Sequence, residues 1–119
     1  LMVALTYSGD AAPTLLAEGI LDTPELHAGE GETSKILAIA PETVHMDRAV
    51  DFVPDVPRSY LSYGSIFRAT PTGVWGEPSK ATAEKGEKAL ERTAELMVEA
   101  LNKAFEYMES KEKFGYSYF

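Results

Sequence analysis

The densest group of side chains able to do chemistry lies in residues 25–34, which read ELHAGEGETS. The imidazole of His27 can move protons or bind a metal near neutral pH. Glu30 and Glu32 can bind a metal or act as a base, and Ser34 adds a hydroxyl group. The group favours acid–base or metal-assisted chemistry.

These residues also have a purely structural interpretation. His27 would then be a surface histidine in a loop, Glu30 or Glu32 would cap a helix, and the glycines would form turns. One histidine beside two glutamates is a common combination. Spacing alone therefore favours the structural interpretation.

Two other residues could contribute to a site. His45 precedes Asp47 by two positions and could be a second metal ligand, although an exposed histidine in a connecting segment is the stronger interpretation. Trp75, between Gly73 and Gly76, could be a substrate-facing ring on a lid or a tryptophan of a core or interface. The sequence contains no P-loop, GxGxxG, GxSxG or HExxH motif, which disfavours those classes.

The first half of the chain predicts a strand and two helices. The apolar run LMVALTY at 1–7 predicts a buried strand. A short helix is predicted over 11–19, because Pro13 suits a first turn. A second is predicted over 30–40, with carboxylates at its positive end and Pro41 stopping it. The polar group would thus occupy a helix N-terminus.

The second half predicts an irregular connection, a strand at 65–70 and a long amphipathic helix over 81–109, capped by Ser79 or Thr82. Two strands make too small a sheet to bury both faces, so this order predicts an α/β fold that is incomplete here. The apolar face of the long helix, expected to pack in the core, consists of Leu90, Ala94, Met97, Leu101, Ala104 and Met108.

Composition limits the function classes. A hydrophobic content of 45% predicts one packed domain rather than a disordered chain. The net charge of -8 disfavours nucleic acid and anionic membranes as partners. Without cysteine, a bound metal must use His, Asp, Glu or water. No run of about 20 apolar residues and no secretory signal are present, so we expect a soluble protein, with the cytoplasm as default location.

Two segments together resemble the creatininase family. They are HAGEGETSKILAIAPETVHMDRAV, at 27–50, and GVWGEPSKATAEKGEKALE, at 73–91. The resemblance extends over 1–109, matches weakly in the first strand and excludes the tail. It implies a layered α/β/α fold of which residues 1–110 are the C-terminal part of a single domain, with 111–119 as an aromatic tail.

The resemblance also implies an activity. The family hydrolyses cyclic amides or related C–N bonds with water activated by a binuclear divalent-metal centre of zinc, manganese or iron. His27 matches the histidine that contacts substrate and helps move a proton to the leaving nitrogen. Glu32 matches a carboxylate that is a metal ligand or the neighbour of one. Glu30, Ser34 and Trp75 are weaker candidates for substrate-binding residues of the same pocket.

The chain departs from the family pattern in one respect. The other metal ligands of the family come from an N-terminal half, with an ExHG-like turn, a bridging Asp and an NGHGGN-like loop, none of which is present. Activity on a small-molecule substrate is therefore expected to require that half, as a missing segment or a separate chain. Since the first residue is Leu1, we expect a cleaved product or part of a longer polypeptide.

The resemblance further implies a homo-oligomer, commonly a hexamer in this family. Two alternatives to an enzyme remain open. One is a non-catalytic structural or oligomerisation module without metal, and the other is a module that binds a small molecule without hydrolysing it.

Overall fold

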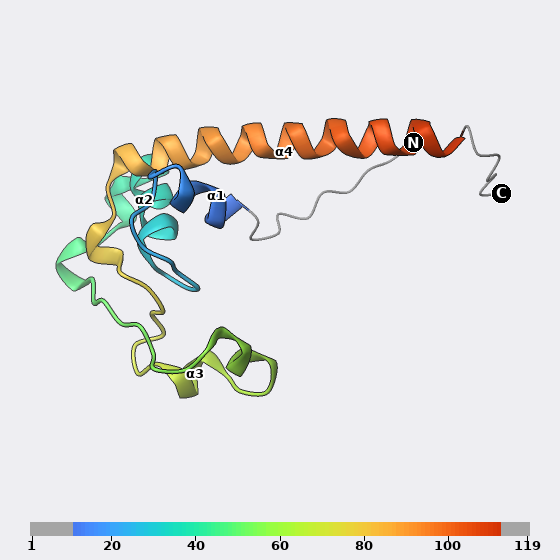
Figure 1. The fold of residues 1–119 in the computed structure, drawn as a ribbon. Coiled ribbons are helices and arrows are strands. Elements are labelled where there is room, and N and C mark those ends of the chain that lie inside the picture. Colours follow the sequence, from blue (N-terminus) through green and yellow to red (C-terminus); the bar gives the residue numbers. More distant parts are fainter. Residues whose placement is uncertain (1–10, 113–119) are drawn as a thin grey trace.

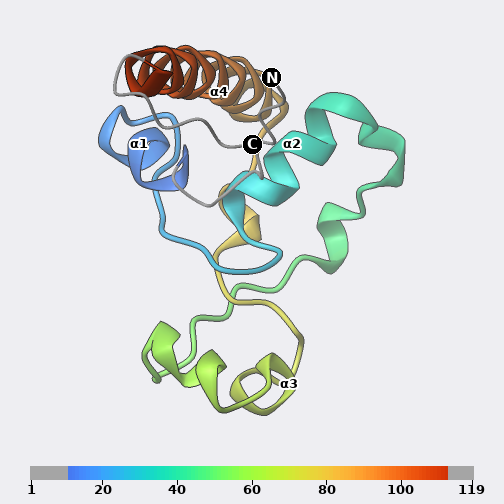
Figure 2. The same cartoon turned by 90° about the vertical axis from the view of Figure 1, so that its right-hand side faces the viewer.

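A computed structural model describes residues 11–112 of the 119-residue chain, with side chains described as far as residue 109. Helices α1 and α2 lie beneath the N-terminal half of α4, and α3 belongs to a separate lower region (Figures 1 and 2). None of the helices within residues 11–112 is both long and apolar enough to cross a lipid bilayer. The α-helices are α1 (Ala11–Ala17), α2 (Glu30–Ile39), α3 (Ile66–Ala69) and α4 (Ala83–Glu112), and the 3-10 helices are η1 (Pro41–Thr43), η2 (Met46–Arg48), η3 (Arg58–Ser62) and η4 (Pro78–Lys80).

A small core joins α1 to α4. Leu15 of α1, Leu21 of the following loop and Ala89 of α4 are all almost completely buried and form one cluster. On the surface above them, Arg92 donates two hydrogen bonds of 2.9 Å to the carboxylate of Glu18. These contacts fix α1 and its loop against the first turns of α4.

The approach of α2 to α4 depends on a glycine. Gly86 is buried, and a Cβ atom there would collide with the backbone carbonyl of Ser34. Ser34 is fully buried, and its hydroxyl accepts a hydrogen bond of 3.2 Å from the backbone N–H of Thr82. The first turns of the two helices are therefore in direct backbone contact.

The expected layered arrangement is not seen in the described residues, which are mostly helical and contain no strand longer than a single bridge. One antiparallel bridge pairs His27 with Trp75, and the other pairs Phe52 with Gly76. Residues 75 and 76 thus hold two otherwise distant segments together. The strand predicted over 1–7 and the aromatic tail at 111–119 lie outside the residues whose side chains are described.

The strand predicted over 65–70 is wrong, because this segment contains helix α3. The hydroxyl of Ser65 accepts a hydrogen bond of 3.2 Å from the backbone N–H of Phe67 and caps the helix. The predicted helices over 11–19, 30–40 and 81–109 are confirmed with small changes of boundary. Thr82 caps α4, because its hydroxyl accepts a hydrogen bond from the backbone N–H of Lys85.

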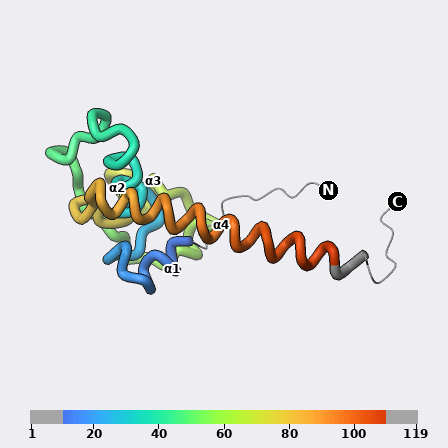
Figure 3. Tube along the Cα trace, turned by 90° about the horizontal axis from the view of Figure 1, so that it is seen from above, coloured from blue at the N-terminus to red at the C-terminus, as the bar shows by residue number. Residues whose placement is uncertain are grey.

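The predicted core face of α4 is wrong over its first half. Leu90 and Met97 are each 37% exposed and Ala94 is also exposed, whereas Gly86, Ala89 and Thr93 are buried. The packed face consists of small residues because α2 approaches so closely. Beyond this contact, α4 extends past the other helices (Figure 3).

We predict that Gly86→Ala destabilises the fold by about 1–3 kcal/mol, because the added methyl group overpacks the contact between α2 and α4. The measurement is urea unfolding followed by circular dichroism. Glu87→Ala, on the exposed side of the same turn, is the control and should leave the unfolding midpoint unchanged. A stabilised Gly86→Ala variant, as expected for an uncrowded helix position, would contradict the close approach.

Candidate functional site

The N-terminus of α2 is organised by the carboxylate of Glu25. This group accepts hydrogen bonds from the backbone N–H groups of Gly31, at 2.8 Å, and Glu32, at 3.1 Å, which otherwise lack partners at a helix start. Burial raises the pKa of Glu25 above its ordinary value, the Gly31 N–H opposes this rise, and the charge of Glu32 adds to it. A side chain at Gly29 or Gly31 would collide with Glu25, so both glycines are required by the contact.

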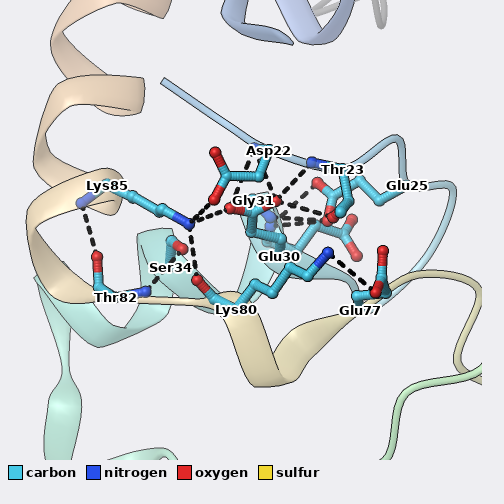
Figure 4. Close-up of polar contacts among 11 residues, drawn as sticks. Asp22, Thr23, Glu25, Glu30, Gly31, Ser34, Glu77, Lys80, Thr82 and Lys85 are labelled. Atoms are coloured by element: carbon cyan, nitrogen blue, oxygen red, sulfur yellow. Dashed lines mark hydrogen bonds and ion pairs between the residues drawn. The ribbon is translucent and has the colours of Figure 1, made fainter. Parts of the chain in front are cut away.

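Glu30 is fully buried at the first position of α2. Its carboxylate accepts hydrogen bonds of 2.8 Å from the backbone N–H and hydroxyl of Thr23, and of 3.0 Å from the backbone N–H of Asp22. It also forms an ion pair with Lys85 of α4, whose ammonium group reaches Asp22 Oδ2 at 2.8 Å and the carbonyl of Lys80 at 2.9 Å (Figure 4). This network joins the 22–23 loop, α2 and α4.

His27 and Glu32 lie next to each other on the surface. Their side chains are 57% and 54% exposed, and His27 Nδ1 is 3.9 Å from Glu32 Oε2. That distance is too long for a hydrogen bond but permits an ionic attraction when the imidazole is protonated. The Glu32 carboxylate accepts a hydrogen bond from the backbone N–H of Ala28. The structure therefore places an accessible imidazole beside an accessible carboxylate.

The backbone that carries His27 is tightly constrained. Its carbonyl accepts a hydrogen bond of 2.8 Å from the backbone N–H of Trp75, and its own N–H donates one of 3.2 Å in return. Ala28 has a φ of 51°, in the left-handed region that residues with a Cβ atom rarely adopt. Such conformations persist where the surrounding contacts enforce them, often at functional sites.

Of the predicted site residues, only His27 and Glu32 present their side chains at the surface beside each other. Glu30 and Ser34 are fully buried and Trp75 is 8% exposed. Each of these three has a structural role in the contacts described above, and their contact with substrate stays a prediction.

The pair supplies part of a metal site. An imidazole nitrogen and a carboxylate oxygen are suitable ligands for zinc, manganese or iron. Between residues 11 and 112, no group of three or more His, Asp or Glu side chains lies close enough together to hold a metal ion. His27 and Glu32 therefore fit such a site in kind but do not complete it among the described residues.

Two supporting residues were not identified from the sequence. Glu25 caps α2 although it lies outside the helix, and Lys85 of α4 is largely shielded and pairs with the buried Glu30. The sequence does contain a signal that Lys85 is shielded. Lys85 precedes Gly86, the one glycine in the sequence of α4, and a glycine within a helix indicates a close contact with another helix.

Comparison with known proteins decides the family. The family model described as creatininase, creatinine amidohydrolase, matches residues 3–101. The chain belongs to the creatininase family. Members of this family are generally dependent on divalent metals, which agrees with the donor types of His27 and Glu32.

Two curated relatives show the extent of the similarity. Creatinine amidohydrolase of Pseudomonas putida is 34% identical over 92 residues, which cover 76% of this creatininase-family chain and 35% of the relative. The 3-dehydro-scyllo-inosose hydrolase of Thermotoga maritima is 33% identical over 93 residues, covering 61% and 30% of the two chains.

A third relative, the mycofactocin precursor peptide peptidase of Mycobacterium ulcerans, is 35% identical over 72 residues, covering 54% and 27%. The chain thus spans about a third of the length of the curated relatives that it matches. No solved structure matches it.

We predict that Glu30→Gln lowers the free energy of unfolding at neutral pH by about 3 kcal/mol, because it leaves Lys85 short of a buried partner. Burial alone would raise the pKa of Glu30, but hydrogen bonds from Lys85, Thr23 and Asp22 outweigh it and hold this pKa below the ordinary value of 4.5. The stabilisation is therefore present above pH 4.5 and is lost as the pH falls through the lower pKa of the folded state.

Urea unfolding at several pH values measures this effect. The difference between wild type and Glu30→Gln should be largest at neutral pH and shrink below pH 4.5. Glu84→Gln is the control, since it breaks an exposed pair with Lys88 on the same helix and should leave the unfolding midpoint unchanged. A difference that does not change with pH would contradict a charged Glu30 in the folded state.

Proposed function

We propose that this chain supplies His27 and Glu32 to the active site of a metal-dependent amidohydrolase that cleaves a cyclic amide or a related C–N bond. The observation that carries the proposal is the exposed imidazole and carboxylate, 3.9 Å apart, within the segment that matches the family. Further support comes from the relatives, which are named as an amidohydrolase, a hydrolase and a peptidase.

The proposed cofactor is a divalent metal, zinc, manganese or iron, at a centre that is binuclear in the complete protein. Glu32, with its exposed carboxylate, would be a ligand or the neighbour of one. When bound, the metal would supply hydroxide near neutral pH by lowering the pKa of its water.

The role proposed for His27 is proton transfer to the leaving nitrogen. Its accessible imidazole is held by the backbone pairing with Trp75 and by the constrained turn at Ala28. If the 3.9 Å gap between Nδ1 and Glu32 Oε2 closes to hydrogen-bond distance, the proton would be held on Nδ1 and Nε2 would be free to exchange a proton with substrate. Glu32 would thus orient His27 even where it also contacts the metal.

The remainder of the site would come from the N-terminal half of the same fold, present as a further segment or a separate chain. This half would also complete the layered α/β/α arrangement. We propose in addition a homo-oligomer, a hexamer by resemblance, that acts on a small molecule in the cytoplasm. The net charge of -8 argues against nucleic acid and anionic membranes as partners.

A non-catalytic structural module is the second candidate. It is favoured by the incomplete donor set of the described residues, where no group of three His, Asp or Glu side chains lies together. Metal content separates the two candidates, because a structural module has no requirement for metal.

We predict that the natively purified protein, together with the partner polypeptide that copurifies with it, contains about two divalent ions per active site. Elemental analysis and mass spectrometry measure the ions and the partner. Glu32→Gln should reduce the metal content, whereas Glu87→Ala, exposed on α4, should not. A protein with neither metal nor partner would favour the structural module.

We predict that His27→Ala lowers kcat by about 10²–10⁴-fold, the usual contribution of a general acid or base. The assay measures the ring-opened product of creatinine hydrolysis by the metal-loaded complex. Other cyclic amides are tested if creatinine is not cleaved. The His27→Ala variant should keep the circular dichroism spectrum of the wild type, which separates a lost proton transfer from a loss of structure. Unchanged kcat in this variant would refute the proposed role.

A further inference from the structure

A hollow surface reaches the turn that carries His27 and the first turn of α2. It encloses about 390 Å³, within the range of about 300–1,000 Å³ typical of small-molecule sites. Ala28 and Thr33, the residues that immediately follow His27 and Glu32, form part of its lining. The rest comes from the η2 segment and from residues 72–78, so three segments distant in sequence meet there. We call this surface the η2 hollow.

The charged and titratable side chains that line the η2 hollow are basic. Its lining includes Arg48 and His45 but no Asp or Glu from the described part of the chain, although the whole sequence has 19 acidic and 11 basic residues. Four acids are adjacent to these segments in the sequence but do not line the hollow. They are Glu32, Asp47, Asp51, which accepts a hydrogen bond from the backbone N–H of Ser79, and Glu77, which pairs with Lys80. An arginine on a wall that itself carries no carboxylate offers an anion a local partner for charge-assisted hydrogen bonds.

The remaining lining is mainly aliphatic. Val44, Met46, Val50 and Val74 contribute apolar side chains, and Thr33 adds a hydroxyl. Val50 is 51% exposed, so its burial by a ligand would be favourable. A ligand that satisfies both features has an aliphatic body and one anionic end.

Arginine selects among anions by its geometry. Its planar guanidinium presents parallel N–H donors that match a carboxylate in a bidentate arrangement. Arg48 is exposed at the last position of η2, and its backbone N–H is bonded to the carbonyl of His45, which keeps the two side chains on one short turn.

We propose that the η2 hollow binds a small aliphatic carboxylate, with the carboxylate paired to Arg48 and His45. The substrate class of the site is then an amide that carries a carboxylate group, with its scissile C–N bond directed toward His27 and Glu32. The placement of the scissile bond rests on the proposed function, whereas binding of the carboxylate does not.

The test is an amide NMR titration of the chain with isovalerate, with isovaleramide as the uncharged control. We expect isovalerate to shift the backbone amides of Ala28, Thr33 and Val74 and the side-chain N–H of Arg48, and isovaleramide to bind at least about tenfold more weakly. Arg48→Gln should weaken isovalerate binding by a similar factor. Arg48→Lys, which keeps the charge but not the paired donors, should give an intermediate loss.

Arg68→Gln is the matched control, because Arg68 is an exposed arginine on α3 and does not line the hollow. It should leave binding unchanged, and the NMR spectra report whether each variant is folded. Equal binding of isovaleramide, unchanged binding by Arg48→Gln, or the absence of shifts at the hollow would overturn the proposal. Inorganic phosphate binding as tightly as isovalerate would also overturn it, since the hollow would then be a general anion site.

His27→Ala separates this proposal from the proposed function. In the metal-loaded complex with its partner polypeptide, it should leave isovalerate binding unchanged while lowering kcat by about 10²–10⁴-fold. Isovalerate binding by a metal-loaded complex that hydrolyses no amide would refute the proposed function and preserve the carboxylate site.

Discussion

The ion pair between Glu30 and Lys85 is the contact on which the rest of the described structure depends. Removing a carboxylate from water costs several kcal/mol, and the attraction of an opposite charge offsets this cost only when other hydrogen bonds complete the group. Here Thr23 and Asp22 supply those bonds, and the Lys85 ammonium group supplies the charge. Because Glu30 is the first residue of α2, this network fixes where the helix starts and how it meets α4.

Helix geometry explains why a buried Glu30 produces an exposed Glu32. Successive residues of an α-helix are separated by about 100°, so Glu32 points about 200° away from Glu30, while Ser34 returns to within about 40° of it. Glu30 and Ser34 accordingly face α4, and Glu32 faces outward, where its carboxylate lies beside His27. The exposed position of Glu32 beside His27 is thus a geometric consequence of the burial of Glu30.

The features that the sequence predicted correctly depend on local signals. Pro41 ends α2, Thr82 caps α4, and helical spacing identifies the long helix without reference to the rest of the molecule. The failure over 65–70 is local as well, because the capping hydroxyl of Ser65 outweighs the strand preference of Ile66 and Phe67. Neither the position of the hollow nor the pairing of residues 27 and 75 could be predicted, because each depends on segments that meet only in the folded chain.

The wrong prediction of which face of α4 packs in the core has a different cause. Hydropathy ranks Leu90 and Met97 above Gly86 and Ala89, but the close approach of α2 requires small residues, and the packed face therefore lies roughly 70° around the helix from the apolar stripe.

The apolar stripe of α4 and the incomplete donor set at His27 and Glu32 share one explanation. A projecting helix whose stripe exposes Leu90 and Met97 leaves apolar area in water that another surface could bury with a favourable free energy. Two ligands cannot enclose a divalent ion, which needs at least about four donors. Under the proposed function, the N-terminal half of the fold would account for both deficits, and the relatives are about three times longer than their matched segments. That half would cover the stripe beside the face that already packs on α2 and bring further ligands to the exposed side of the α2 N-terminus.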